Sequence, residues 1–210
     1  VMGWANAFVL YFVFFVDLGF NVVGPREIAK NYESIKRYVN NISTIKILSS
    51  VVSYCCLIII AIFLDKPIES KYVLLISGLN VFDNAILFKW VFQGIEKMGV
   101  IAIRQVITSI LNLLGVLVFV HNPNDLVLAM VIMIGSLLIN SLWMFFYYVK
   151  IYGRIKFEFD FVFWKELIKA STPIALTLFI VTLYNNFSIF LLGIIRTDFE
   201  TGIYIVAFKM

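Results

Sequence analysis

Long apolar runs dominate the chain and predict membrane-spanning helices. A spanning helix needs about 20 mainly apolar residues, and six runs in the 210-residue sequence reach that length. A seventh run begins near Thr201 and is cut by the end of the sequence. The pattern predicts an all-α polytopic membrane protein with six complete transmembrane helices and the start of a seventh. The six runs are Ala5–Val23, Ile45–Leu64, Tyr72–Gln93, Val100–Val120, Leu126–Val149 and Thr172–Ile195.

Composition supports this interpretation and excludes several protein classes. Apolar residues make up 62% of the chain and charged residues 14%, against about 45–50% and about 25% in soluble domains. The mean hydropathy is +0.97. These values exclude a disordered chain, a disulfide scaffold and a typical soluble enzyme. Cys55 and Cys56 are adjacent in an apolar run, so they are poorly placed to brace a fold.

The distribution of basic residues predicts the orientation of the helices. Lys and Arg concentrate in every second connection, whereas the alternate connections hold only Lys66, Lys71 and Arg196. The positive-inside rule places the basic connections in the cytoplasm. The first helix then runs from outside to inside, so we expect an odd number of helices, most simply one, to precede it.

The segment between the fifth and sixth runs has a different pattern. A helix beginning at Asp160 would place Phe161 and Trp164 on an apolar face and Lys165 on a charged face. A short helix of this kind lies in the membrane interface. We therefore expect an interfacial segment that joins two helix bundles.

The third run carries an unusual set of polar residues. At 100° per residue, Asp83, Lys89, Trp90 and Gln93 fall within one arc of about 140°. Asp83 lies near the middle of the run, where a carboxylate is costly unless it is paired or faces a cavity. Such a carboxylate indicates either a function or an ion pair with a basic neighbour.

Other runs place polar residues at a similar depth. A polar layer shared by several helices favours a translocation cavity over a lipid-facing wall. The alternative is that single Asn and Ser residues only tie helices together. Lys46 and Arg104 lie toward the predicted cytoplasmic ends, where basic residues also serve as anchors for topology or lipid headgroups. The residues of the predicted layer are Asp83, Asn112, Asn140 and Asn185.

Motifs for enzymatic chemistry are absent from the sequence. There is no phosphate-binding glycine loop, no zinc-ligand spacing and no nucleophile elbow. We therefore expect neither a catalytic residue nor a metal or cofactor, and we do not expect an enzyme.

Two blocks of the sequence resemble a known family. Asp17-Leu18-Gly19-Phe20 with Gly24–Asn31 is similar to the "D-x-G-F … R-E-I-A-x-N" signature of bacterial Wzx-type polysaccharide flippases. Trp90–Met98 resembles the "W-x-F-Q-G-x-E-x-M" block of the same polysaccharide biosynthesis family. This family belongs to the multidrug/oligosaccharidyl-lipid/polysaccharide exporter superfamily.

The resemblance implies a fold and an activity. The fold would be a two-lobe transporter of about 12 to 14 helices, with an N-terminal lobe lacking its first helix over residues 1–149. A cytoplasmic interfacial linker would follow over 150–170, and the start of the C-terminal lobe over 171–210. The activity would be the flipping of an undecaprenyl-diphosphate-linked oligosaccharide, such as an O-antigen repeat unit, across the bacterial inner membrane by alternating access. The implied partners are this substrate, membrane lipids, a coupling H⁺ or Na⁺ and a glycan polymerase complex, without nucleic acid.

Roles for individual residues follow from their chemistry on this interpretation. Basic side chains on the cytoplasmic side would attract the diphosphate, and polar side chains in the cavity would bond to sugar hydroxyls. A buried carboxylate, Asp17 or Asp83, would carry the coupling ion. The candidate substrate-binding residues are Arg26, Lys46, Asp83, Lys89, Trp90, Gln93, Arg104, Asn112, Asn140 and Asn185.

Several alternatives remain open at this stage. A cation-coupled multidrug antiporter or a lipid II-type flippase of the same superfamily would share the fold. A membrane glycan polymerase or transferase is disfavoured because the predicted outside loops are all short. A purely structural membrane protein is disfavoured by the aligned polar layer.

Overall fold

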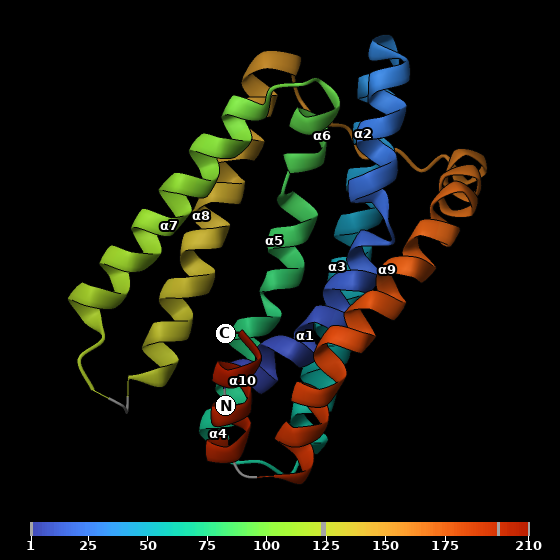
Figure 1. Ribbon diagram of the computed structural model, residues 1–210. Coiled ribbons are helices and arrows are strands. Elements are labelled where there is room, and N and C mark those ends of the chain that lie inside the picture. The colour runs from blue at the N-terminus through green and yellow to red at the C-terminus, as the bar shows by residue number, and fades with distance from the viewer. Residues whose placement is uncertain (1, 123–124, 197, 210) are drawn as a thin grey trace.

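The chain folds into helices joined by short connections (Figure 1). This computed structural model describes residues 2–122, 125–196 and 198–209, and these residues include no strand. A 3-10 turn, η1 (Tyr32–Ser34), joins the second helix to the third. The helices are α1 (Met2–Asp17), α2 (Phe20–Lys30), α3 (Ile35–Phe63), α4 (Ile68–Gly78), α5 (Asn80–Ile86), α6 (Lys89–Gly94), α7 (Met98–Phe119), α8 (Leu126–Tyr152), α9 (Phe161–Ile195) and α10 (Asp198–Lys209).

Six stretches of the described chain are long and apolar enough to cross a membrane. The prediction of an all-α polytopic membrane protein with six spans is therefore confirmed. Some observed helices extend beyond the predicted runs, since α3 begins at Ile35 rather than near Ile45. The six stretches are Met2–Lys30, Tyr32–Phe63, Ile68–Gly94, Met98–Phe119, Leu126–Tyr152 and Phe161–Gly193.

The connections gather alternately at the two ends of the helix bundle (Figure 1). Those after α2, α6 and α8 lie at one end, which we call the basic end because it holds the connections that are rich in Lys and Arg. The connections after α3, α7 and α9 lie at the opposite end. Six crossings explain why the basic residues alternate along the sequence.

The first span is broken between α1 and α2. Leu18 and Gly19 both have positive φ angles, 45° and 80°, which stop a right-handed helix. Glycine adopts this conformation without a steric penalty, whereas leucine is strained in it. Space is also limited at Gly19, because a Cβ atom there would lie 3.2 Å from the backbone nitrogen of Ala175. The predicted continuous helix over Ala5–Val23 is therefore wrong at this point.

The third span is also discontinuous. It consists of α4, α5 and α6, with a turn at Leu79 and a clear break at Leu87, where the backbone is extended (φ −70°, ψ 110°). The expected single polar arc does not form, because a helical arc requires one continuous helix. Asp83 and Trp90 are buried, whereas Lys89 and Gln93 are exposed.

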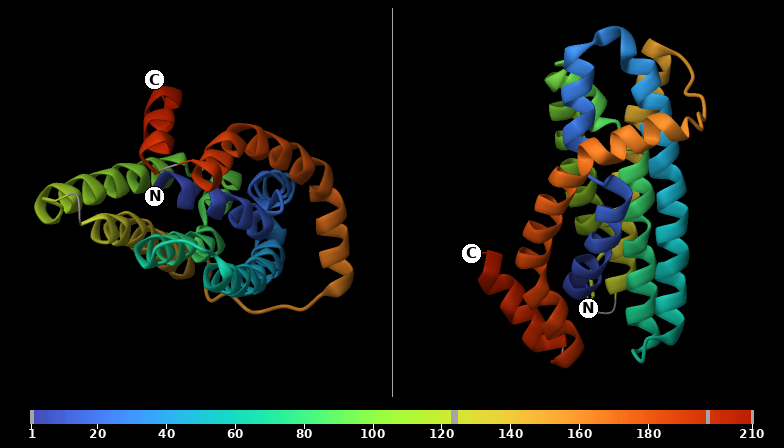
Figure 2. Two further views of the ribbon diagram at one scale, coloured as in Figure 1. Left: turned by 90° about the horizontal axis from the view of Figure 1, so that it is seen from below. Right: turned by 90° about the vertical axis from the view of Figure 1, so that its right-hand side faces the viewer.

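The predicted interfacial segment and the sixth run are parts of one helix. Helix α9 continues from Phe161 to Ile195 and curves along its length (Figure 2). Pro173 lies inside it, and a proline bends a helix because it removes one backbone hydrogen bond and crowds the preceding turn. The interfacial segment and the sixth run are therefore joined through a bent helix.

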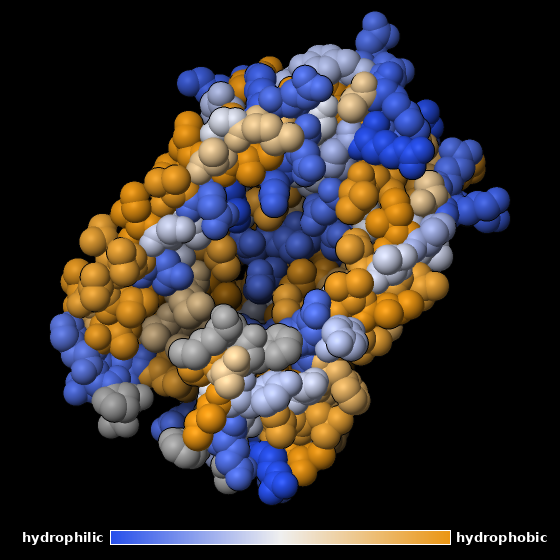
Figure 3. All heavy atoms as spheres, viewed as in Figure 1, coloured by the Kyte–Doolittle hydropathy of each residue, from blue (hydrophilic) through white to orange (hydrophobic). Residues whose placement is uncertain are grey.

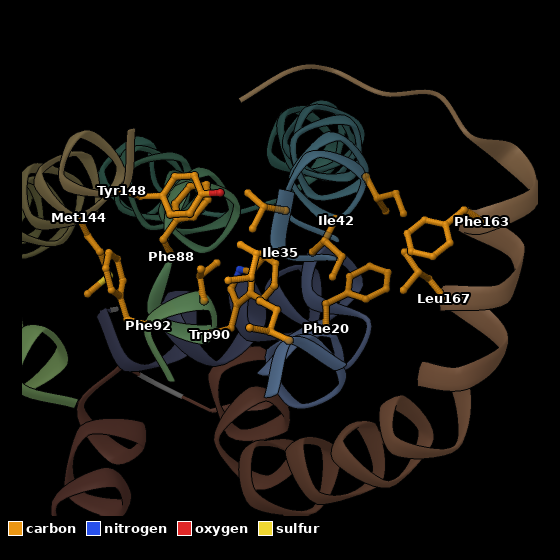
Figure 4. Packing of buried hydrophobic residues seen from close by; sticks show 14 residues of the cluster. Phe20, Ile35, Ile42, Phe88, Trp90, Phe92, Met144, Tyr148, Phe163 and Leu167 are labelled. Carbon is orange, nitrogen blue, oxygen red and sulfur yellow. The ribbon is translucent and has the colours of Figure 1, made fainter. Parts of the chain in front are cut away.

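Helices α2 and α6 pack closely near the basic end. Gly24 of α2 lies against the indole ring of Trp90 on α6, and Gly94 of α6 lies against Pro25 and Ile28 of α2. Figure 4 shows Trp90 within the surrounding apolar cluster, which Phe20 joins from α2. The two half-helices that follow the breaks are thus joined into one packed pair.

Candidate functional site

Charged side chains are buried inside the predicted spans. Lys46 is completely buried. The exposed fraction is only 5% for Asp83 and 7% for Arg104. They come from α3, α5 and α7 respectively. A buried charge is rarely kept without a partner or a function, so these residues define the candidate site.

Lys46 forms the first buried centre. Its Nζ atom lies 3.0 Å from Oδ1 of Asp17 and donates to Oδ1 of Asn21 at 3.0 Å. It also donates to Oδ1 of Asn84 at 3.4 Å. An ammonium group has three hydrogens, so the three acceptors satisfy it completely. The centre joins four helices, α1, α2, α3 and α5.

The first centre lies at the break in the first span. Asp17 is the last residue of α1, and Asn21 is in the first turn of α2. The backbone N–H of Asn21 also donates to Oδ1 of Asp17 at 3.2 Å. The ion pair with Lys46 therefore connects the two half-helices across the strained residues between them.

Asp83 and Arg104 form the second buried centre. The hydroxyl of Ser141 on α8 donates to Oδ1 of Asp83 at 2.5 Å. Arg104 on α7 is close enough to Asp83 for electrostatic interaction, but no ion pair within 4.0 Å joins them among the described residues. The buried Nε atom of Arg104 has no hydrogen-bond partner within the described chain. Its guanidinium therefore retains donor capacity.

The two centres share the short helix α5. Asp83 faces the second centre and its neighbour Asn84 faces the first. Helix α5 is bounded by Leu79 and by the break at Leu87. A displacement of α5 would therefore alter both centres together.

The polar mid-span layer forms only in part. Asn140 is buried, and its amide donates to the backbone of its own helix, to Ser136 O at 3.5 Å. Asn112 on α7 is half-buried and Asn185 on α9 is exposed. No hydrogen bond among the described residues joins either of them to Asp83, so the structure brings together Asp83, Ser141 and Arg104 instead.

The other candidates lie near the basic end. Arg26 is exposed, with its Nε 4.0 Å from the carboxylate of Glu27. Lys89 and Gln93 are exposed on α6, whereas Trp90 is buried against Gly24. Trp90 therefore has a packing environment, while the three polar residues remain accessible.

The face shown in Figure 3 is hollowed near its centre, and hydrophilic residues gather there. In the same view of the ribbon, α5 and α6 lie between the pair α7 and α8 on one side and α9 on the other (Figure 1). The polar residues of α5 and α6 that retain exposed surface are Asn80, Asn84, Lys89 and Gln93.

The connection between α8 and α9 is tied to α3. The Glu158 carboxylate accepts hydrogen bonds from the side-chain amides of Asn40 at 2.6 Å and Asn41 at 2.9 Å. Asn41 also accepts from the indole N–H of Trp164 at 2.8 Å. The segment 153–160 forms no regular helix or strand, but these bonds hold it against the bundle.

Asp160 caps the helix that follows this segment. Its Oδ1 accepts from the backbone N–H of Phe163 at 3.0 Å, and its Oδ2 accepts from Arg37 at 3.2 Å. These bonds, the one from Phe163 foremost, hold the pKa of the Asp160 carboxyl below its ordinary value.

Sequence reasoning missed three members of the centres, Asn21, Asn84 and Ser141. Asn84 is adjacent to Asp83, and neighbouring residues of a helix point about 100° apart, so the two side chains cannot share one face. Many serines in helices bond only to the backbone of their own helix, so the sequence does not distinguish Ser141 from them. Among the described residues, no group of three His, Cys, Asp or Glu could hold a metal ion.

Comparison with known proteins agrees with the resemblance in the sequence. The chain is 25% identical over 212 aligned residues to a "Putative O-antigen transporter" of Shigella dysenteriae, covering 96% of this chain and 50% of that protein. It is 29% identical over 136 residues to a protein of the same name from Escherichia coli K12, covering 61% of this chain and 32% of that protein. No solved structure matches.

The chain spans half the length, or less, of these curated relatives. Both relatives are named as transporters, in agreement with the expectation that the chain is not an enzyme. The model of the family described as "Polysaccharide biosynthesis protein" matches residues 1–210. With its blocks of Asp17–Asn31 and Trp90–Met98, its six spans and this match over its whole length, the chain belongs to the polysaccharide biosynthesis protein family.

Proposed function

We propose that the chain is part of a transporter that moves an undecaprenyl-diphosphate-linked oligosaccharide from the cytoplasmic to the outer leaflet. Membership of the polysaccharide biosynthesis family and the names of both relatives support this substrate class over cationic drugs. A sugar and diphosphate headgroup cannot cross hydrocarbon unaided, because its desolvation is too costly. A polar path through the six-span bundle would remove that cost.

The observation that carries this proposal is the buried guanidinium of Arg104. It lies within a predicted span, its Nε is without a hydrogen-bond partner in the described chain, and Asp83 is near it without a direct ion pair. A guanidinium presents several N–H groups in a planar fork that suits phosphate oxygens. We assign Arg104 as the intramembrane contact of the diphosphate, with Asp83 balancing its charge when the substrate is absent.

The exposed polar residues supply the other contacts in this mechanism. Arg26 and Lys89 would attract the diphosphate at the basic end, which we assign to the cytoplasm from the positive-inside rule. Gln93, Asn112 and Asn185 retain exposed or half-exposed amides, which can donate to and accept from sugar hydroxyls. Lys46, Trp90 and Asn140 are satisfied or packed within the bundle and would position these groups rather than touch the sugar.

Alternating access is supported by the broken spans. Interrupted helices beside a polar site are a common feature of transporters, and residues at the ends of helices can act as hinges. Here α2 and α6 follow the breaks at Leu18–Gly19 and Leu87–Phe88 and pack together as one pair. We assign this pair as the moving element at the cytoplasmic end of the N-terminal lobe, residues 1–149. The segment 150–170 would link it to a C-terminal lobe that begins at residue 171.

Asp83 is the better candidate for a coupling H⁺ or Na⁺. Asp17 is already paired with Lys46 at 3.0 Å, whereas Asp83 is held by a neutral hydroxyl. A carboxylate without a direct ion pair is freer to take up a cation when the substrate moves Arg104 away. In this cycle, the cation would bind Asp83 while the diphosphate engages Arg104, so substrate and ion would occupy the second centre together.

The test uses the full-length gene in a strain that lacks it. Loss of surface polysaccharide with accumulation of lipid-linked repeat units on the inner leaflet, both restored by the gene, would support flipping. Arg104→Gln should then fail to restore export at normal membrane levels, while the exposed control Lys165→Gln should restore it. Full export by Arg104→Gln would contradict the assignment. Normal glycan with an altered drug-resistance profile would identify an antiporter instead.

A further inference from the structure

A second, apolar cavity lies on another side of the bundle. Its volume is about 310 Å³, and it is bordered by α3, α5 and α8 and by the segment 153–160. Figure 2 shows this segment on the side of the bundle opposite α10, whereas the polar hollow of Figure 3 faces the same side as α10. The cavity is therefore separate from the candidate transport site. The residues that line it are Ser43, Ile47, Ala85, Ile86, Phe88, Phe145, Phe146, Val149, Arg154, Ile155 and Phe157.

The cover of this cavity is fixed by hydrogen bonds to α3. The backbone N–H of Lys156 donates to Oδ1 of Asn40 at 3.1 Å, and that of Glu158 donates to Oγ1 of Thr44 at 3.2 Å. These bonds anchor the segment directly beside the cavity-lining residues Ile155 and Phe157. Because the walls are already in place, a ligand would not have to order them on binding.

One charged residue, Arg154, and one neutral polar residue, Ser43, line this mainly apolar space. Arg154 is exposed, and its side chain makes no hydrogen bond or ion pair with the described residues. Lys150 and Lys156 lie close to it in the chain and are also exposed. Phe146 and Phe157 line the same cavity and are exposed too, so hydrocarbon from outside the bundle can reach it. The site thus combines an apolar interior with positive charge at the basic end.

We propose that this cavity binds an anionic phospholipid of the leaflet at the basic end. One acyl chain would fill the space between α3 and α8, and the phosphate group would lie against Arg154. Basic pockets between transmembrane helices bind anionic lipid headgroups in this way, and a mainly apolar interior disfavours a sugar headgroup because it offers too few hydrogen bonds for its hydroxyls. The proposal depends on the membrane location of the chain and not on the transported substrate.

The test measures lipid binding to the full-length transporter purified in detergent. Native mass spectrometry with added phosphatidylglycerol or phosphatidylcholine gives the apparent affinity for each lipid. Arg154→Gln should weaken phosphatidylglycerol binding roughly fivefold, which corresponds to about 1 kcal/mol for one basic contact, and Arg154→Lys should retain most of it. The matched control Lys36→Gln removes one exposed charge from α3, away from the cavity, and should leave binding unchanged.

A second variant tests the apolar half of the site. Ala85→Leu adds volume to the cavity wall without changing charge, and it should also weaken phosphatidylglycerol binding. Monodisperse elution and an unchanged unfolding temperature show that each variant is folded. Equal binding of the two lipids, undiminished binding by Arg154→Gln or Ala85→Leu, or an equal loss with Lys36→Gln would overturn the proposal. A preference for undecaprenyl phosphate over phosphatidylglycerol would overturn the assignment to a phospholipid.

Discussion

Gly24 on α2 lies directly against the indole ring of Trp90 on α6, and a Cβ atom at Gly24 would overlap that ring. Each residue belongs to a different block of the sequence that resembles the polysaccharide biosynthesis family. The contact shows that at least part of each block serves to join two half-helices.

Replacing Gly24 tests this contact. Gly24→Ala should lower the free energy of unfolding by about 1–3 kcal/mol, because the added methyl group overpacks a filled site. Thermal unfolding of the purified full-length transporter should show a lower midpoint. The control is Gly99→Ala, since nothing lies within 4 Å of a Cβ atom at Gly99. Equal midpoints for the two variants would show that α2 can shift away from Trp90 at little cost.

Removing the ammonium of Lys46 should be strongly destabilising. Lys46→Met leaves the half-buried Asp17 carboxylate without its partner, and breaking a buried ion pair from one side costs about 3–5 kcal/mol. The double variant Lys46→Met with Asp17→Asn should recover part of this loss, because no unpaired charge remains. Unfolding midpoints of the purified variants measure both effects. Lys36→Met on the same helix is exposed and serves as the control.

The bond from Ser141 to Asp83 can be tested against a neighbouring serine. Ser141→Ala leaves a buried carboxylate without its hydroxyl donor, so it should lower the free energy of unfolding by about 1–3 kcal/mol. Ser136→Ala on the same helix removes only a bond to the backbone of Met133, and its effect should be smaller. The comparison uses thermal unfolding at one pH. A larger loss for Ser136→Ala would show that the Asp83 contact contributes little.

The cap at Asp160 predicts a pH dependence. The pKa of Asp160 is lowered in the folded protein. The charged carboxylate therefore stabilises the folded state, and this stabilisation is fully present above the unfolded pKa of about 3.9. It is lost as the pH falls through the lower folded pKa, because the protonated carboxyl binds Phe163 N–H and Arg37 more weakly. The difference in unfolding midpoint between the wild type and Asp160→Ala should therefore be largest near neutral pH and shrink under acid conditions.

A control separates this cap from general acid sensitivity. Asp65→Ala removes an exposed carboxyl in the connection between α3 and α4. The difference in unfolding midpoint between this variant and the wild type should stay small across the same pH range. If the difference in unfolding midpoint between the wild type and Asp160→Ala is constant with pH, the stabilisation does not come from the charged carboxylate.

The membrane fold could be predicted from sequence because hydropathy acts locally. Each run of apolar residues must be helical in a bilayer to satisfy its own backbone hydrogen bonds, whatever its neighbours are. The run at Val100–Val120 predicts α7 almost to its ends. The breaks after Asp17 and Ile86 could not be read in this way, because apolar residues continue through both of them and only the surrounding helices stabilise the altered backbone.

The candidate site could be predicted only as a set of residue types. The sequence by itself determined that Asp17, Lys46, Asp83 and Arg104 lie within or beside apolar segments, where a charge requires a partner or a function. Only the tertiary structure decided that Lys46 pairs with Asp17, and that Asp83 is held by Ser141 with Arg104 near it. The physical reason is that a residue's cost of burial depends on its own chemistry, whereas its partner depends on which helices pack together and in which rotation.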